Sequence, residues 1–290
     1  MLRLPGNVYY AYSTAVEWGR RSHWFPIIRS TDLVSWRHVG DAFRRPPAWA
    51  RDRHWAPSAL QHEGRTHLFY SARGRSGRHC VAMASARRPR GPFRHRAVLA
   101  CGRPLGYIDP FGFVDPATGQ PWLYVARADP TCHRRPGRCF IAAMPLSSDL
   151  TRVIGPRKVV LGVTEPWERR RGYETVENPY VFESGGRYYI LYSGNDWRSP
   201  DYAMGYAVGP TPVGPFVKAG PPVMAGTDAV RGPGGGSLVE GPGGGLWMAY
   251  HARRRGVGDP RRRSLHLDPV ALMAGELFTP GPSRAQPLTP

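Results

Sequence analysis

The sequence contains almost no lysine and no long apolar run. Lys158 and Lys218 are its only lysines, so 40 − 2 = 38 of its basic residues are arginine. No stretch approaches the ~20 consecutive apolar residues that a membrane-spanning helix requires, and we therefore expect no membrane partner. Residues 1–7 lack the apolar segment of a signal peptide, which leaves the cellular compartment open.

Motifs that accompany nucleic-acid or nucleotide binding are also missing. The net charge of +19 suggests a nucleic-acid partner, because clustered cations release counterions from phosphate backbones. The arginines, however, are scattered from Arg3 to Arg284 without an RNP motif, zinc-finger spacing or basic helix, so we expect no such partner. P-loop, HExxH and GxSxG motifs are absent. A basic scaffold for acidic polymers stays as an alternative, and its affinity would fall steeply with salt.

Cysteine is scarce as well. The four cysteines, Cys80, Cys101, Cys132 and Cys139, show neither a CxxC motif nor metal-ligand spacing. Cys132 and Cys139 flank a loop that a disulfide would close in an exported protein. Four free buried thiols are the alternative.

Glycine and proline, in contrast, are abundant. Together they make up 35 + 31 = 66 of the 290 residues, without a collagen-like period. Such a composition excludes a helical bundle and predicts many short strands joined by turns. A chain of this length can bury one large core, so we expect a single all-β domain over residues 1–290.

An aromatic-rich strand recurs five times along the chain. Its last tyrosine is Tyr12, Tyr70, Tyr124, Tyr192 or Tyr250, at spacings of 58, 54, 68 and 58 residues. A glycine-containing turn precedes most copies, which suits units of three or four antiparallel strands. Five such units predict a five-bladed β-propeller, which closes radially and hides its sheet edges. A two-layer sandwich is the competing fold, but it gives no reason for a fivefold repeat.

The same repeat brings a second set of residues into phase. Fifteen residues before the last four tyrosines lie Trp55, Asp109, Glu177 and Gly235. Because the first strand of each propeller blade lines the central channel, equivalent positions converge near the axis. We expect Asp109 and Glu177 to share one pocket with Trp55 beside them. Two convergent carboxylates raise one another's pKa, which keeps one of them protonated as an acid.

Each of these residues also has an ordinary structural explanation. An Asp-Pro pair usually opens a turn, and we interpret Asp115 with Pro116 in this way. A single glutamate is most often a solvated surface group, and Glu174 competes for any role of Glu177. The shared phase of Asp109 and Glu177 is what favours a functional interpretation.

Together the motifs resemble glycoside hydrolase family 43, whose members are five-bladed propellers that remove arabinofuranose or xylose units from plant polysaccharides. The resemblance covers nearly the whole chain and is carried by residues 9–14, 30–36, 55–57, 91–93, 108–110, 176–179, 192–194, 214–216 and 250–252. It implies inverting hydrolysis of terminal α-L-arabinofuranosyl or β-D-xylosyl units, with a pentose-containing oligo- or polysaccharide as partner. Arabinose against xylose, and exo against endo cleavage, stay open.

The resemblance also implies roles for individual residues. Glu177 matches the general acid that protonates the departing sugar oxygen, and Asp109 matches the supporting Asp that orients this acid and raises its pKa. Trp55, Tyr12 and His251 are expected to contact the sugar. Some members hold a cation on the axis through a histidine of the fifth blade, which makes His251 the candidate ligand of a structural Ca²⁺. A hydrogen-bonded core histidine is the alternative, and no cofactor is required for the reaction.

The family's general base, an Asp of the first blade, has no counterpart in residues 1–12, which contain no Asp or Glu. Fifteen residues before Tyr12 is position 12 − 15 = −3, ahead of Met1. Asp32 lies in a Ser-Thr-Asp-Leu turn and is a poor substitute. We expect either a base encoded upstream, with blade 1 incomplete at the N-terminus, or a sugar-binding propeller without turnover.

Overall fold

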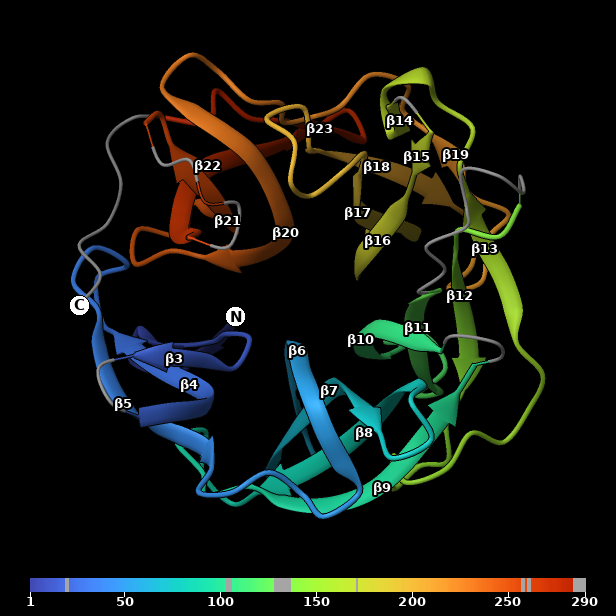
Figure 1. The fold of residues 1–290 in the computed structure, drawn as a ribbon. Helices are drawn as coiled ribbons and strands as arrows, with labels where there is room; N and C mark the ends of the chain where they lie inside the picture. The colour runs from blue at the N-terminus through green and yellow to red at the C-terminus, as the bar shows by residue number, and fades with distance from the viewer. Residues whose placement is uncertain are drawn as a thin grey trace.

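The computed structural model describes residues 1–18, 21–102, 106–127, 137–170, 172–256, 259 and 262–283. Five of its six sheets surround a central axis, and each is built from one contiguous stretch of chain (Figure 1). The five-bladed β-propeller that the tyrosine repeat predicts is therefore confirmed. None of the helical segments in these ranges is long and apolar enough to cross a membrane.

Each blade begins with the strand nearest the axis and continues outward through antiparallel neighbours. Blade 1 contains β1 (Leu2–Leu4), β2 (Val8–Tyr12), β3 (Val16–Trp18), β4 (Arg21–Ser30) and β5 (Arg37–Phe43). Blade 2 contains β6 (Ala50–His62), β7 (Arg65–Gly74), β8 (His79–Ala86) and β9 (Arg94–Cys101). Blade 3 contains β10 (Tyr107–Val114), β11 (Pro121–Arg127), β12 (Phe140–Pro145) and β13 (Lys158–Gly162).

Blades 4 and 5 complete the ring. Blade 4 contains β16 (Val176–Ser184), β17 (Arg187–Gly194), β18 (Ala203–Gly209) and β19 (Val217–Lys218). Blade 5 contains β20 (Val230–Glu240), β21 (Leu246–Arg254), β22 (Ser264–Met273) and β23 (Glu276–Phe278). An insertion between blades 3 and 4 forms η2 (Pro166–Glu168), β14 (Arg169–Arg170) and β15 (Tyr173–Glu174). This insertion contributes to the longest tyrosine spacing.

The recurring aromatic strands are the second strands of the blades, and they build the core. Tyr70, Tyr124, Tyr192 and Tyr250 are all buried. Between the first and second strands the chain turns through residues with positive φ, such as Gly185 and Gly186 at +59° and +73°. Glycine adopts these angles without steric cost, which explains the glycine turns of the repeat.

The inner strands β6, β10, β16 and β20 each contain an irregularity at the same phase of the repeat. The register shifts lie between Trp55 and Ser58, Ile108 and Phe111, Glu177 and Tyr180, and Gly234 and Ser237. A β-bulge of this kind bends a strand, redirects its side chains and is frequent beside active sites. The phase found in the sequence thus marks the same backbone feature in four blades.

The three cysteines among the described residues are oxidised rather than free. Cys80 and Cys101 form a disulfide that joins β8 to β9. Cys139 is also disulfide-bonded, and its partner lies outside the described residues, as does the Cys132 of the expected pair. The alternative of four free thiols is wrong, since none of the described cysteines is free.

Candidate active site

The backbone around the axis is held in an unusual conformation in several blades. Ala56, Asp109 and Asn178 have φ values of +46°, +52° and +53°. A non-glycine residue in this left-handed region costs ~1–3 kcal/mol, and such residues cluster at functional sites. In blade 5 the corresponding place is taken by Gly235, at φ +64°, where glycine avoids that cost.

Asp109 of β10 and Glu177 of β16 belong to one hydrogen-bond network. The Tyr202 hydroxyl donates to Glu177 Oε1 at 2.6 Å, and the backbone N–H of Asn178 donates to Asp109 Oδ2 at 3.2 Å. The side-chain amide of Asn178 donates to the Tyr202 hydroxyl oxygen at 2.9 Å. Asn178 therefore links the two carboxylates through its main chain and its side chain.

Both carboxyl groups have a raised pKa. Burial is the main reason that the pKa of Asp109 lies well above its usual value, and the charge of Glu177 raises it further. Burial likewise raises the pKa of Glu177, although the Tyr202 hydroxyl and the Arg263 charge act against it. Because two carboxylates in a dry site resist double ionisation, the pair retains a proton over part of the pH range in which isolated carboxyls are ionised.

Tyr202, which the sequence analysis did not single out, is the residue that contacts Glu177 directly. It is fully buried just before β18, and burial together with the Glu177 charge raises its pKa well above the usual range. Its hydroxyl therefore stays protonated and donates. A Cβ added at Gly234 would lie 2.1 Å from the Tyr202 ring, so the glycines of β20 leave the space that this ring fills.

His251 of β21 lies against the same tyrosine. Its ring stacks on Tyr202 with centroids 6.1 Å apart, and its Nε2 is 3.1 Å from Nη1 of Arg263. Burial first, and then the charge of Arg263, lowers the pKa of His251 well below its usual value, so the imidazole is neutral and its Nε2 accepts from the guanidinium. These residues do not fit the Ca²⁺ suggested at His251, because Arg263 already brings a positive charge to that nitrogen.

Arg263 is the second residue that sequence reasoning missed. It lies between β21 and β22, and its guanidinium carbon is 5.5 Å from the centre of the Trp197 ring. Its charge lowers the pKa of Asp109 and of Glu177. In the sequence it is one arginine of a short run, and nothing there distinguishes it from the others.

Trp55 and Tyr12 occupy different surroundings. The half-buried Trp55 ring in the bulge of β6 stacks on His79 with centroids 4.8 Å apart, and the Arg53 guanidinium lies 5.3 Å from its centre. The Tyr12 hydroxyl donates to the carbonyl oxygen of Pro89 at 2.8 Å, and its ring packs edge-on against Phe93. The hydroxyl of Tyr12 thus joins blade 1 to blade 2.

Asp32 and Asp115, which the sequence analysis assigned to turns, do lie in turns. Asp32 Oδ1 accepts hydrogen bonds from the backbone N–H groups of Val34 and Ser35. Asp115 accepts from the Thr118 hydroxyl and the Ala117 N–H. Asp32 and Asp115 therefore stabilise local turns.

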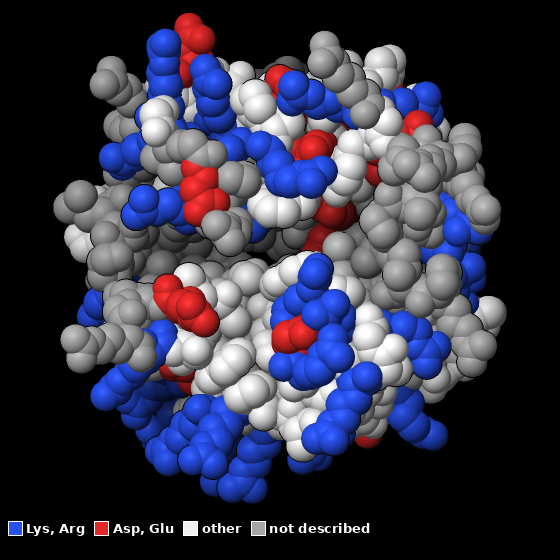
Figure 2. All heavy atoms as spheres, viewed as in Figure 1, with Lys and Arg blue, Asp and Glu red and all other residues white. Residues whose placement is uncertain are grey.

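The surface of the ring shows where a ligand can enter. In Figure 2 the face toward the viewer is hollowed at its centre, and acidic atoms form part of the wall of this hollow within a mostly basic surface. The N-terminus lies beside the same central opening in Figure 1. Acidic groups that gather at the centre of an otherwise cationic protein indicate a functional site, because the rest of the surface carries the opposite charge.

The comparisons with known proteins agree with this geometry. The sequence profile of glycosyl hydrolases family 43 matches residues 1–278. A β-D-galactofuranosidase, xynD, of Aspergillus niger is 26% identical over 279 residues, which span 90% of this chain and 74% of that protein. The crystal structure of a thermostable family-43 glycoside hydrolase has a TM-score of 0.85 and 29% identity, covering 100% of this chain and 95% of the other.

A second solved structure, an endo-1,4-β-xylanase from Bacteroides thetaiotaomicron, has a TM-score of 0.80 and 26% identity and covers 98% of this chain and 94% of that one. The family match extends over nearly all of the propeller and includes the strands that carry Asp109 and Glu177. The chain is a glycoside hydrolase that belongs to glycosyl hydrolases family 43.

Proposed function

We propose that the protein hydrolyses terminal α-L-arabinofuranosyl or β-D-xylosyl units of pentose-containing oligo- or polysaccharides with inversion at the anomeric carbon. The observation that carries this proposal is the pair formed by the buried Asp109 and the half-buried Glu177, whose pKa values are both raised. The names of two relatives, a galactofuranosidase and a xylanase, support furanosides and xylose polymers as the substrate classes to test.

In the proposed reaction Glu177 is the general acid. Its proton passes to the glycosidic oxygen while the bond from this oxygen to the anomeric carbon breaks. The Tyr202 hydroxyl, 2.6 Å from Glu177 Oε1, holds the carboxyl group in position and stabilises the carboxylate that forms. Asp109 is a positioning residue, because its charge favours the protonated form of Glu177.

Three further side chains are proposed to bind the sugar. The guanidinium of Arg263 lies at hydrogen-bond distance from His251, so these two groups present donors and an imidazole face beside the acid pair. Trp55, whose ring packs against His79 and the Arg53 guanidinium, is proposed to contact the sugar through the exposed part of its half-buried side chain. No step of the reaction is assigned to a metal ion or to Tyr12.

An inverting enzyme also needs a carboxylate base ~6.5–9.5 Å from the acid, with a water between the base and the anomeric carbon. The family's base is an Asp of the first blade, and residues 1–12 contain no Asp or Glu. Hydrolysis of 4-nitrophenyl α-L-arabinofuranoside and β-D-xyloside should therefore be measured for the 290-residue chain and for a form extended by the residues encoded upstream. Proton NMR of the first product anomer reports the stereochemistry.

We expect hydrolysis by the extended form, with inversion. Retention of configuration would overturn the proposed mechanism, and turnover by the 290-residue chain would place the base elsewhere. The absence of Asp and Glu from residues 1–12 favours a second candidate, a sugar-binding propeller without turnover. That candidate is supported if neither form hydrolyses either glycoside while calorimetry detects pentose binding.

A further inference from the structure

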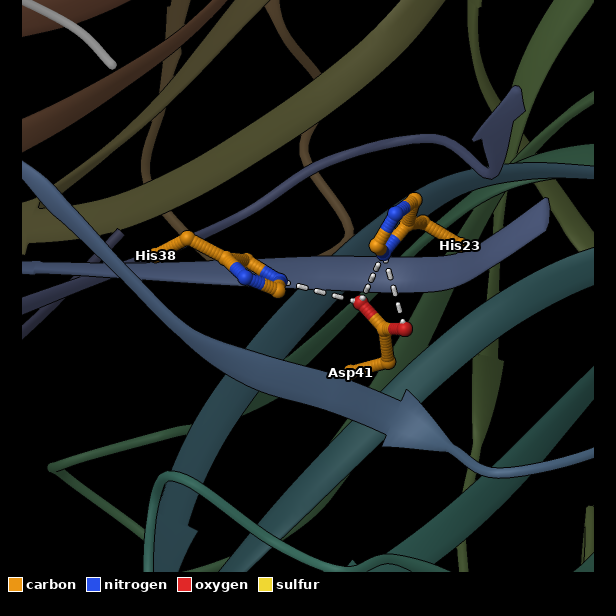
Figure 3. A group of neighbouring side chains, drawn as sticks. All are labelled: His23, His38 and Asp41. Carbon is orange, nitrogen blue, oxygen red and sulfur yellow. Dashed lines mark hydrogen bonds and ion pairs between the residues drawn. The ribbon is translucent and has the colours of Figure 1, made fainter. Parts of the chain in front are cut away.

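A second group of titratable side chains lies in the outer half of blade 1, away from the strands that line the axis. His23 is on β4, and His38 and Asp41 are on the neighbouring edge strand β5. Figure 3 shows the two imidazoles reaching the Asp41 carboxylate from either side. The three side chains thus converge from two paired strands.

The distances in this group are close to those that a bound metal imposes. His23 Nδ1 lies 3.1 and 3.0 Å from the two oxygens of Asp41, and His38 Nε2 lies 3.1 Å from Asp41 Oδ1. All three ligand atoms lie within 4.8 Å of one another. Tetrahedral zinc with bonds of ~2.0–2.1 Å holds its ligand atoms ~3.3 Å apart, so small side-chain movements would complete the geometry.

The chemistry of the donors selects the kind of metal. Two imidazole nitrogens and one carboxylate oxygen suit Zn²⁺, whereas Ca²⁺ requires six to eight oxygen ligands. The net charge of +19 opposes the binding of any cation through charge alone. Coordinate bonds to imidazole therefore favour a transition metal over an alkaline-earth ion at this place.

Burial leaves room for one more ligand. The side chains of His23, His38 and Asp41 are 16%, 25% and 23% exposed. Each side chain therefore keeps some contact with solvent, from which a water would come as the fourth ligand. No other set of three His, Cys, Asp or Glu side chains within the described ranges has this spacing.

The next blade shows what such a site would do. In blade 2 the edge strand β9 is fastened to β8 by the disulfide between Cys80 and Cys101. Blade 1 has no cysteine, and the pairing of its edge strand β5 with β4 is interrupted by a register shift between Ile27 and Ile28. His23 and Asp41 lie on the corresponding third and fourth strands of blade 1.

We propose that His23, His38 and Asp41 bind one Zn²⁺, with water as the fourth ligand, and that this ion fastens β5 to β4. The site is structural. It does not depend on the glycosidase activity, and it resembles the disulfide of blade 2 in its position and effect.

The test uses tag-free protein from which metal has been removed with a chelator. Calorimetric titration with ZnCl₂ is expected to show one site that is lost, or weakened at least ~10-fold, in His23→Ala and in Asp41→Asn. A matched control is His62→Ala, because His62 contacts the Ser148 carbonyl oxygen outside this group and its variant should keep the site. Co²⁺ in place of Zn²⁺ should give the visible absorption of a tetrahedral complex.

Thermal unfolding supplies the second readout. Zn²⁺ at a hundredfold excess over its Kd should raise the Tm of the wild-type protein by ~5 °C, and a chelator should reverse the rise. Asp41→Asn preserves the shape of the side chain, so folding of this variant can be verified by circular dichroism. The proposal is overturned if wild-type protein shows no saturable site, or if folded Asp41→Asn binds Zn²⁺ as tightly as wild type.

Discussion

Two of the places where the propeller buries carboxyl groups treat these groups in opposite ways. Glu168, in the insertion before blade 4, has a side chain that is 0% exposed and pairs with Lys218 at 2.5 Å. It also accepts hydrogen bonds from the Tyr192 hydroxyl and from the backbone N–H groups of Thr164 and Glu165. Four donors, one of them a cation, stabilise its charge.

Asp109 is also buried and Glu177 is half-buried, but each accepts only one hydrogen bond among those the structure resolves for the described residues. The charge of Glu177 acts on Asp109 and adds to the effect of burial. A carboxylate without enough donors holds its proton more tightly, because burial penalises the charged form. The fold therefore supplies donors to the structural carboxylate Glu168 and few donors to the pair that is proposed to transfer a proton.

The largest expected effect is on catalytic activity, and it distinguishes Glu177 from the structural carboxylate Glu168. Glu177→Gln removes the proton that the acid donates, and kcat/KM for glycosides with poor leaving groups should fall ~10³-fold or more. Pentose affinity, measured by calorimetry, should change little. Glu183→Gln, at the other end of the same strand and half-buried there, is the control and should retain activity. A Glu177→Gln enzyme with the rate of wild type would remove Glu177 from the role of acid.

The next largest effect is on the free energy of unfolding, and it concerns the ion pair of Glu168. Lys218→Met leaves Glu168 buried without its cation, which should lower the free energy of unfolding by ~3–5 kcal/mol in urea titrations. The other lysine, Lys158, is exposed on β13 and provides the control, since Lys158→Met should change stability by less than ~0.5 kcal/mol. Equal stability of the two variants would mean that the buried ion pair contributes nothing beyond a surface charge.

A smaller effect is expected at Asp109, with opposite signs for stability and activity. The pKa of Asp109 is raised in the folded protein, so its contribution to stability is present below the unfolded pKa of ~3.9 and is lost as pH rises through the folded value. Asp109→Asn avoids this loss and should stabilise the protein by ~1 kcal/mol at pH 7. The gain should vanish near pH 3.5 in the same unfolding experiment.

The same variant should alter the pH profile of activity. Without the negative charge of Asp109, the pKa of Glu177 should fall, and the alkaline limb of kcat should move to lower pH. The rate at the optimum should fall ~10-fold or more, because the acid is no longer positioned. An unchanged profile together with an unchanged stability would show that the two carboxyl groups do not interact.

The smallest effect concerns Tyr202. Tyr202→Phe removes a hydrogen bond that stabilises the charged form of Glu177, so the alkaline limb should move to higher pH, opposite to Asp109→Asn. The loss in rate should be ~5–10-fold, equivalent to a hydrogen bond of ~1 kcal/mol. Tyr107→Phe, which removes a hydroxyl that contacts Arg157, is the control and should leave the profile unchanged. A shift in the same direction as Asp109→Asn would contradict the assigned network.

The comparison also shows which parts of the site the sequence could predict. Asp109 and Glu177 lie on first strands at one phase of the repeat, so counting from the core tyrosines identifies them. Tyr202 precedes a third strand, and Arg263 lies in a connection between strands. Neither position is in phase with the carboxylates, and both reach the site only because the blades curve around the axis.

The cysteines illustrate the same limit. The sequence drew attention to Cys132 and Cys139, which are close along the chain. The disulfide between Cys80 and Cys101 spans 21 residues and depends on β9 folding back beside β8. Such a disulfide forms between strands that are neighbours in the sheet. These neighbours can be identified from the sequence only once the whole blade is recognised.

The joint between blades 5 and 1 is different in kind from the other four. At those four joints the chain continues from one blade into the next. At the fifth joint, none of the described strands of blade 5 belongs to the sheet of blade 1. Apolar packing and an ion pair between Arg3 and Glu240 hold the two blades together there. The side chains of this ion pair are 36% and 50% exposed. Exposed ion pairs contribute little, so apolar packing, together with the hydrogen bond from the Met1 amino group to Ser237 Oγ at 3.4 Å, holds this joint.

We expect the ring to open locally at the joint between blades 5 and 1 before the whole propeller unfolds. Amide hydrogens of β1 should exchange with solvent through local opening, while those of β7 and β17 should exchange only through global unfolding. Since β20 forms one side of this joint and also a wall of the channel, each such opening would briefly widen the path by which a ligand enters and leaves.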